Sequence, residues 1–521
     1  MRKFKRLAAM LLALIMVWGM TTTAYAVNIT LSKTDSVYSA YRLLTAEKLT
    51  DGSGKYNYTV VEKYAGILAD ITGETESGEI LKYIEAMETD SAELKAFAAA
   101  VYKAIDEADL DADEVSEAGV IENADQGYYL IAETTLSDAA DTYSLIMLRT
   151  AGEEDITVST KEGKPEVVKS VKEVNDSTGE TSWGKYADHD LYDEIEYQIK
   201  GTVSSEYADY KSYYYSFVDE MSDSLTLNGE SVTVWVGGTV DEDGTYNKNG
   251  VEVTEQFEIT TQDHKLVATA NLKELTGVEI DGTSEIYVLY TATLNENAVH
   301  GKEGNENEVY LKYENNPYHE ADGDNDPKTP NEPETPGETP KDINIVFTFK
   351  TLVNKVDAEN AALEGAGFTL YKWNGSVWEE VEEVVGTEED SITEFEFKGL
   401  DCGKYKLSET TIPNGYNQAE DIIFEVEAEY EMDTATGKMK LVNLIAKDEQ
   451  GAEISSTDGE DQQFLVDGNL SGFSTTVINK PGVTLPTTGG VGTTIFYIAG
   501  GVLVVAAVVL LITKKRMSGE K

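Results

Sequence analysis

The chain has 521 residues and a formal charge of −55, with 41% hydrophobic residues and 30 tyrosines. A charge of this size repels nucleic acids and anionic lipid surfaces and excludes a role in binding either. The hydrophobic fraction is sufficient for packed cores, so we expect folded domains with an acidic, solvated surface. Only one cysteine, Cys402, occurs, which excludes an intramolecular disulfide. With no His near it in sequence, Cys402 is predicted to be a small buried residue between strands rather than a reactive thiol.

The N-terminus has the pattern of an export signal. Four basic residues within the first six precede an apolar run from Leu7 to Met20, and Ala24-Tyr25-Ala26 supplies a small-x-small cleavage sequence. This order predicts a secretory signal peptide over residues 1–26 that is removed from the mature protein.

The C-terminal segment, residues 485–521, combines a pentapeptide, an apolar stretch and a basic tail. The stretch Ile495 to Ile512 is long enough to cross a bilayer as a helix, and the Lys514-Lys515-Arg516 cluster favours a cytoplasmic tail. The pentapeptide Leu485-Pro486-Thr487-Thr488-Gly489, placed just before them, resembles the LPXTG sorting signal of sortase substrates. The resemblance implies that a sortase cysteine attacks the Thr488 carbonyl, releases Gly489 onward and passes the acyl group to an amine. A simple membrane anchor is the alternative.

The region between the two signals is long enough for about three domains. We expect a mainly β fold, with tandem immunoglobulin-like β-sandwiches preceded by a mixed α/β domain. Residues 27–160 form the mixed N-terminal domain, and residues 161–316 form a middle β-sandwich. Residues 317–341 form a Pro-rich acidic linker, and residues 342–484 form a second β-sandwich.

Helix and strand patterns alternate in the first predicted domain. Asp90 and Glu93 are predicted to form a capping box, and the apolar residues after them repeat on one helix face. Residues 127–131 and 143–148 read as strands that close the domain. The helix-face residues are Leu94, Phe97, Val101 and Ile105.

Short β-rich runs dominate the middle domain. Residues 195–199 and 286–290 are examples, separated by Gly, Asn and Asp turns. The tyrosines from Tyr207 to Tyr215 predict an aromatic strand edge with solvated hydroxyls, and a carbohydrate-binding platform is the alternative.

Six of the ten prolines lie within residues 317–341, which predicts a stiff, extended, solvated linker. Asp322, Asp324 and Asp326 imitate the start of a calcium loop. However, Pro327 and Pro333 stand where such a loop needs Gly and Glu, so no metal site is expected.

Apolar and polar residues alternate again in the last predicted domain. Four apolar residues are predicted to lie on one face of a single strand, and the same period continues in a second strand. The first set is Ile343, Ile345, Phe347 and Phe349, and the second is Phe368, Leu370 and Lys372.

Segments 354–371, 405–416 and 477–481 of this last domain resemble the collagen-adhesin B-type fold of surface proteins and pilins. The resemblance implies an isopeptide bond between Lys355 and Asn479, assisted by Glu409. Burial lowers the pKa of a lysine and raises that of a carboxyl group, so a neutral amine can attack the amide while the acid relays protons. A buried ion pair beside a capped asparagine is the alternative.

The middle domain resembles the collagen-adhesin A-type pilin sandwich in segments 164–171, 215–226 and 305–313. The corresponding residues are Lys169, Asp219 and Asn307, where Asp219 assists the bond. Asn305 shares a strand face with Asn307, which lies nearer the core-facing run and is preferred.

The acyl group on Thr488 needs an amine, which is either a cell-wall peptide or a lysine of another subunit. In shaft pilins the acceptor lysine ends the first domain in a V-Y-P-K pattern, and residues 156–161 occupy that junction here with Ser159-Thr160 in place of Tyr-Pro. Lys161 is the predicted acceptor. Lys164 is the second candidate. The alternative is that the lysine at this junction is an ordinary solvated residue with no role in polymerisation.

These features predict a major shaft pilin on a Gram-positive cell wall, with pilus-type and housekeeping sortases, identical subunits and peptidoglycan as partners. The alternative is a monomeric adhesin or accessory pilin that binds a host glycan or matrix. The scattered histidines and the lack of H-E-x-x-H or G-x-S-x-G motifs disfavour an enzyme, and no cofactor is expected.

Overall fold

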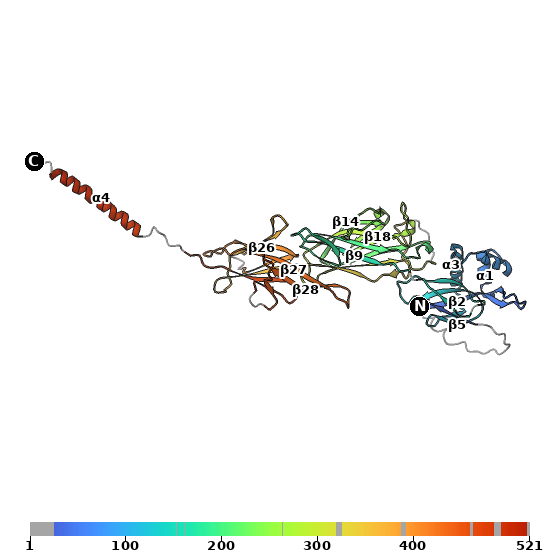
Figure 1. Ribbon diagram of the computed structural model, residues 1–521. Coiled ribbons are helices and arrows are strands. Elements are labelled where there is room, and N and C mark those ends of the chain that lie inside the picture. Colours follow the sequence, from blue (N-terminus) through green and yellow to red (C-terminus); the bar gives the residue numbers. More distant parts are fainter. Residues whose placement is uncertain are drawn as a thin grey trace.

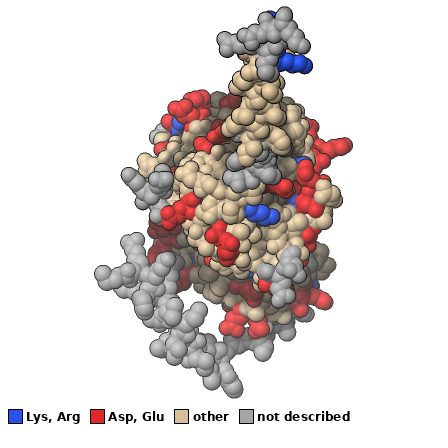
Figure 2. Space-filling view, turned by 90° about the vertical axis from the view of Figure 1, so that its left-hand side faces the viewer, with Lys and Arg blue, Asp and Glu red and all other residues tan. Residues whose placement is uncertain are grey.

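Three β-rich bodies follow one another along the chain and lie in a row in the computed structural model (Figure 1). The predicted mainly β fold class, with a mixed first domain, is confirmed. Asp and Glu side chains are spread over the face shown in Figure 2, among few Lys and Arg. The signal peptide before residue 26 and the pentapeptide 485–489 lie outside the described residues. The structure describes residues 26–152, 154–161, 163–262, 264–318, 326–386, 392–458, 462–483 and 491–517.

The first domain packs a sheet of order β3-β2-β6-β7 between three helices and a small sheet of order β5-β1-β8. Leu130 of β6 faces the helices and Ile131 faces the small sheet, as strand alternation requires. The bounds are β1 Val27–Leu31, β2 Val37–Lys48, β3 Tyr56–Val60, α1 Glu62–Thr72, α2 Ser77–Glu85, α3 Ala92–Glu107, β4 Glu114–Val115, β5 Val120–Ala124, β6 Gly127–Thr135, β7 Leu145–Arg149 and β8 Ile156–Val158.

The predicted capping box at the start of α3 is wrong by one residue. Ser91 is the N-cap, and its hydroxyl accepts a hydrogen bond from Leu94 N at 3.1 Å. Asp90 instead has φ of 59°, a turn conformation that an aspartate tolerates. The predicted apolar face holds, with Phe97, Val101 and Ile105 buried.

The middle domain is a sandwich of two large sheets, ordered β10-β9-β12-β18-β14-β15 and β11-β21-β19-β13-β17-β16. One apolar core lies between them. The bounds are β9 Val167–Val174, β10 Thr181–Gly184, β11 Tyr186–Asp188, β12 Glu194–Thr202, β13 Tyr214–Met221, β14 Leu225–Val236, β15 Val251–Glu252, β16 Glu258–Gln262, β17 Lys265–Asn271, β18 Glu285–Leu294, β19 Asn305–Tyr313, β20 Gly337–Glu338 and β21 Asp342–Phe347, with short 3-10 turns at Tyr207–Asp209, Thr254–Gln256 and Leu272–Glu274.

The tyrosine cluster belongs to this core and not to a solvated edge. Tyr207, Tyr210, Tyr213, Tyr214 and Tyr215 are each at most 7% exposed. Tyr214 and Tyr215 begin β13, which lies between β19 and β17 inside the sheet. Both the predicted strand edge and the carbohydrate platform are therefore wrong, because these rings have no accessible face.

The C-terminal domain is a second sandwich, with sheets of order β25-β22-β31-β30-β29 and β24-β23-β26-β27-β28. Strands β22 and β31 pair in parallel, which places Lys355 opposite Val477. The bounds are β22 Phe349–Val356, β23 Gly367–Trp373, β24 Trp378–Val385, β25 Glu394–Leu400, β26 Gly403–Thr411, β27 Ile422–Met432, β28 Met439–Lys447, β29 Ser455–Ser456, β30 Phe464–Val466 and β31 Gly472–Ile478.

The strand predicted to open the C-terminal domain is two strands. Thr348 separates β21, which pairs with β19 of the middle domain, from β22. Along β21, Val346 faces the middle core while Ile345 and Phe347 pack into the C-terminal core. A single strand thus joins the two sandwiches.

The described part of the predicted linker is largely exposed to solvent but does not extend as a free spacer. Pro327 O accepts a hydrogen bond from Asn271 N at 2.8 Å, and β20 pairs with β19. Residues 326–341 therefore run along the middle domain. Asp326 accepts a hydrogen bond from Lys328 N at 3.0 Å, while Asp322 and Asp324 lie outside the described residues.

A buried lysine ties the two sandwiches together. Lys372 of β23 lies 2.7 Å from Asp176, 2.6 Å from Asp190 and 2.7 Å from Asp401. Burial alone lowers the pKa of Lys372, but Asp401 and Asp190 hold it above its usual range. Cys402, next to Asp401, is partly buried against the C-terminal core, and burial raises its thiol pKa well above the ordinary value. The ammonium thus offsets part of the negative charge of these carboxylates, and Cys402 is unsuited to act as a thiolate.

Helix α4, Val491–Met517, lies beyond the C-terminal domain (Figure 1). Its segment Ile495–Lys515 has a mean hydropathy of 2.9 and is not buried against the rest of the chain. By length and composition it can cross a membrane.

Candidate functional site

The middle domain buries Lys169 on β9, Asp219 on β13 and Asn307 on β19, all fully inaccessible. Lys169 Nζ forms a short ion pair with Asp219 Oδ2. It also donates to the Tyr290 hydroxyl at 2.7 Å, and Asn307 Nδ2 donates to the same hydroxyl at 2.8 Å. Tyr290 in turn donates to Asp219 at 3.2 Å. The structure therefore brings the three predicted residues together around one phenol.

Burial sets the charge state of this cluster. It lowers the pKa of Lys169 to about 8, against the opposing pull of Asp219. It also raises the pKa of Asp219, although Lys169 lowers it. Both shifts favour a neutral amine beside a protonated acid over the ion pair. Asn307 Oδ1 is buried and has no hydrogen-bond partner among the described residues, so its carbonyl is free to receive a proton.

The alternative residue Asn305 is committed elsewhere. Its Oδ1 accepts from Val299 N at 2.8 Å, and its Nδ2 donates to Val346 O at 2.9 Å. Asn305 therefore holds a loop and β21 in place, while Asn307 faces the lysine.

Sequence reasoning missed Tyr290. Its inward direction could have been read from the alternation of Ile286, Val288 and Tyr290, which all join the core. That pattern does not say which inward residue meets Lys169.

The C-terminal domain has a second cluster of the same residue types. Lys355 on β22, Glu409 on β26 and Asn479 just after β31 are at most 2% exposed. Asn479 Nδ2 donates to Glu409 Oε1 at 2.8 Å, and Lys355 Nζ lies 4.0 Å from the same oxygen. The amine otherwise donates to the backbone carbonyls of Val356 and Val477, at 3.1 and 3.2 Å.

Burial lowers the pKa of Lys355, with Glu409 opposing. Asn479 Oδ1, like its counterpart, is buried without a hydrogen-bond partner in the described part of the chain. Glu409 is positioned by Ala419 N, which donates to its Oε2 at 2.7 Å. Here the acid contacts the amide directly, with no phenol between them.

The two acceptor candidates lie where the first domain meets the middle domain. Lys161 Nζ is 2.5 Å from Asp209 and 3.6 Å from Glu206, above the Tyr318 ring. Burial alone lowers the pKa of Lys161, but Tyr318, Asp209 and Glu206 raise it above its usual value. The Lys164 side chain, 40% exposed, pairs with two carboxylates of the first domain.

Known protein families match two parts of this chain. Residues 478–518 match the LPXTG cell wall anchor motif. Residues 349–440 match the SpaA family, described as a prealbumin-like fold domain. The chain thus ends in a cell-wall anchor signal of Gram-positive type, preceded by a SpaA-like sandwich.

The trypsin-resistant surface T6 protein of Streptococcus pyogenes serotype M6 is 28% identical over 270 residues, which are 50% of this chain. The match spans 45% of that relative, or about half its length. The solved T6 backbone pilin has 18% identity and a TM-score of 0.55, covering 89% of this chain and 100% of its own. The major pilin SpaD from Corynebacterium diphtheriae aligns over 88% of this chain and 98% of its own, with 14% identity and a TM-score of 0.45. The T6 structure shows a shared three-domain fold.

Proposed function

We propose that this chain is the shaft subunit of a covalently polymerised surface pilus. A pilus-type sortase joins Thr488 to Lys161 of the next subunit, and a housekeeping sortase transfers the finished fibre to peptidoglycan. The observation that carries the proposal is an LPXTG anchor motif following two domains that each bury a lysine, a carboxyl group and an asparagine. The T6-like fold over most of the chain supports it.

In each sandwich the buried amine forms an isopeptide bond. Lys169 Nζ attacks Asn307 Cγ and Lys355 Nζ attacks Asn479 Cγ, and the amide nitrogen leaves as ammonia. Asp219 and Glu409 relay the proton from the amine to the leaving group, which is the general acid–base role. The lowered lysine pKa values and the unpaired amide oxygens support this chemistry.

The two bonds shorten the path of tension through a subunit. Tension enters at Lys161, reaches Lys169, crosses to Asn307, continues through β21 to Lys355 and crosses to Asn479 before reaching Thr488. The strands between each bonded pair carry no load along this route. A fibre built this way resists extension without any disulfide, in keeping with its single cysteine.

Lys161 suits the acceptor role because it follows β8 at the junction of the first and middle domains. Lys164 is engaged in ion pairs as Lys161 is, by Asp138 and Asp141, so ion pairing does not distinguish the two lysines.

Two experiments test the proposal. Cells that carry the pilus sortase and K161A should give monomer only on denaturing gels, whereas K164A should retain high-mass ladders. Ladders in K161A would place the acceptor elsewhere. Separately, the full-length chain can be purified from cells without sortase and its mass compared with that calculated for the chain after signal-peptide removal. The measured mass should be lower by two ammonia molecules, and an unshifted mass would refute the two bonds.

A further inference from the structure

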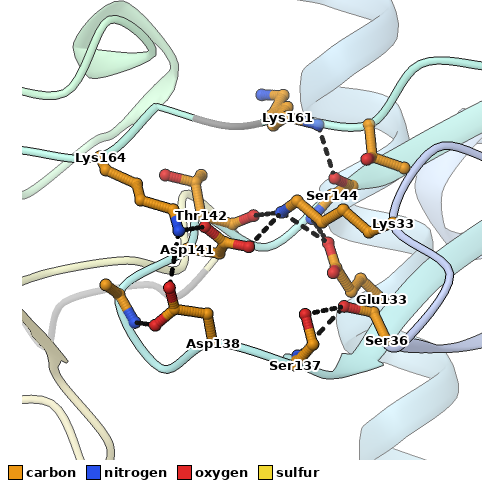
Figure 3. Close-up of polar contacts among 12 residues, drawn as sticks. Lys33, Ser36, Glu133, Ser137, Asp138, Asp141, Thr142, Ser144, Lys161 and Lys164 are labelled. Carbon is orange, nitrogen blue, oxygen red and sulfur yellow. Dashed lines mark hydrogen bonds and ion pairs between the residues drawn. The ribbon is translucent and has the colours of Figure 1, made fainter.

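The first domain contains a third buried lysine between carboxyl groups. Lys33, just after β1, is 9% exposed, Glu133 on β6 is 3% exposed and Asp141 in the β6–β7 loop is 5% exposed. Figure 3 shows the three side chains converging although Lys33 and Asp141 are far apart in sequence. None of these residues belongs to the two clusters described above.

The distances place the amine between the two acids. Lys33 Nζ lies 3.4 Å from Asp141 Oδ2 and 3.7 Å from Glu133 Oε2, and it donates to Thr142 O at 3.2 Å. In the C-terminal cluster the lysine lies 4.0 Å from its acid, so the first-domain amine is at least as close.

Glu133 is oriented as a proton relay. Its Oε2 accepts from Ser144 N at 3.0 Å, and its Oε1 accepts from the Tyr38 hydroxyl at 3.3 Å. These donors fix the carboxylate on the side facing Lys33 (Figure 3).

We propose that Lys33 and Asp141 form an intramolecular isopeptide bond with release of water. Glu133 takes a proton from the Lys33 ammonium and passes it to Asp141 Oδ2. The neutral amine then attacks Asp141 Cγ, and Glu133 moves a second proton from the added nitrogen to Oδ2. The C–Oδ2 bond breaks and Oδ2 leaves as water, with Glu133 returned to its ionised form. In sum, one ammonium and one carboxylate become one amide and one water, with no co-reactant.

Lys164 supplies the remaining element. Its Nζ lies 2.6 Å from Asp141 Oδ1, as an ion pair rather than a directed hydrogen bond. Oδ1 becomes the amide oxygen and carries the negative charge that develops when the amine adds, so the ammonium stabilises that charge. This role also accounts for a lysine that the proposed polymerisation does not use.

The test is peptide mass spectrometry of the mature protein released from the cell wall. Wild type should give a branched tryptic peptide that joins Lys33 to Asp141, lighter than its two parts by one water, with no cleavage after Lys33. K33R, D141A and E133Q should lose it. K63R is the matched control: Lys63 pairs with Asp113 at 3.2 Å but is partly exposed, and the variant should keep the branched peptide.

Folding of the variants can be checked separately. Among the described residues before the anchor, α-helices occur only in the first domain, so the helical circular dichroism signal reports its folding. K33R should keep that signal while losing the branched peptide. Unlinked Lys33 and Asp141 peptides from folded wild type would overturn the proposal. Because this bond releases water and the other two release ammonia, its failure is distinguishable from theirs.

Discussion

The two sandwich clusters contain the same residue types but connect different parts of their domains. In the middle domain, Lys169 and Asn307 lie on opposite sheets, so a bond between them crosses the core. In the C-terminal domain, Lys355 lies on β22 and Asn479 directly follows β31, its parallel neighbour in the same sheet. The first bond would hold two sheets together, and the second would prevent neighbouring strands from sliding. Similar chemistry can therefore resist two different modes of unfolding.

Removing the bond of the middle domain should have the largest effect. N307A loses the cross-link and with it loop-closure stabilisation of about 5 kcal/mol. N305A is the control: it loses hydrogen bonds worth about 1–3 kcal/mol but keeps the ammonia loss. Denaturant unfolding with intact-mass measurement gives both quantities. Equal destabilisation with the bond intact in both variants would remove the distinction between the two asparagines.

N479A tests the bond of the C-terminal domain under mechanical load. In single-molecule pulling from residue 161 to the C-terminus, wild type should release no length from the residues that the two bonds enclose, 170–306 and 356–478. N479A should release length from the C-terminal domain alone and N307A from the middle domain alone. The fall in unfolding free energy for N479A should again be about 5 kcal/mol. Extension of bonded wild type to its full contour length would contradict the assignment.

The free lysine left in N307A should make stability depend on pH. Its folded pKa of about 8 is below its ordinary value of 10.5, so unfolding takes up a proton between those values. The stability of N307A relative to wild type should rise across pH 8 to 10.5, by about 3 kcal/mol at most. The proposed bond acylates this amine in wild type, which would then lack this ionisation. Parallel pH profiles for the two proteins would show that Lys169 is not free in the variant.

Tyr290 is the feature that the C-terminal cluster lacks. Y290F removes the hydroxyl shared by Lys169, Asp219 and Asn307, and should slow bond formation in the middle domain roughly 100-fold. Pulse-chase mass measurement should then show one ammonia lost early instead of two. Y197F is the control, since the Tyr197 ring stacks on Tyr290 but its hydroxyl has no hydrogen-bond partner among the described residues. Equal rates for Y290F and wild type would leave the phenol a structural role only.

The fold class and the export signals could be predicted because each is encoded locally. Alternation with period two identifies strands, and an apolar stretch with flanking charges identifies a membrane segment wherever the chain folds. The three residue types of each cluster were also predictable, since they lie in short motifs on separate strands. The predictions that failed concern position: the N-cap at Ser91, the placement of β21, and the tyrosines around Tyr213.

The failed predictions and the contacts that were not predicted have the same physical cause. Periodicity tells which face of a strand points inward, but not which strand lies opposite it. The pairing of β21 with β19, the phenol of Tyr290 between amine and amide, and the contact of Lys33 with Asp141 all join residues distant in the chain. The secondary-structure elements, the anchor and the residue types of the two clusters follow from local sequence patterns. Only tertiary packing decided which amine meets which carbonyl, because that choice depends on how the sheets stack and on the burial that this stacking creates.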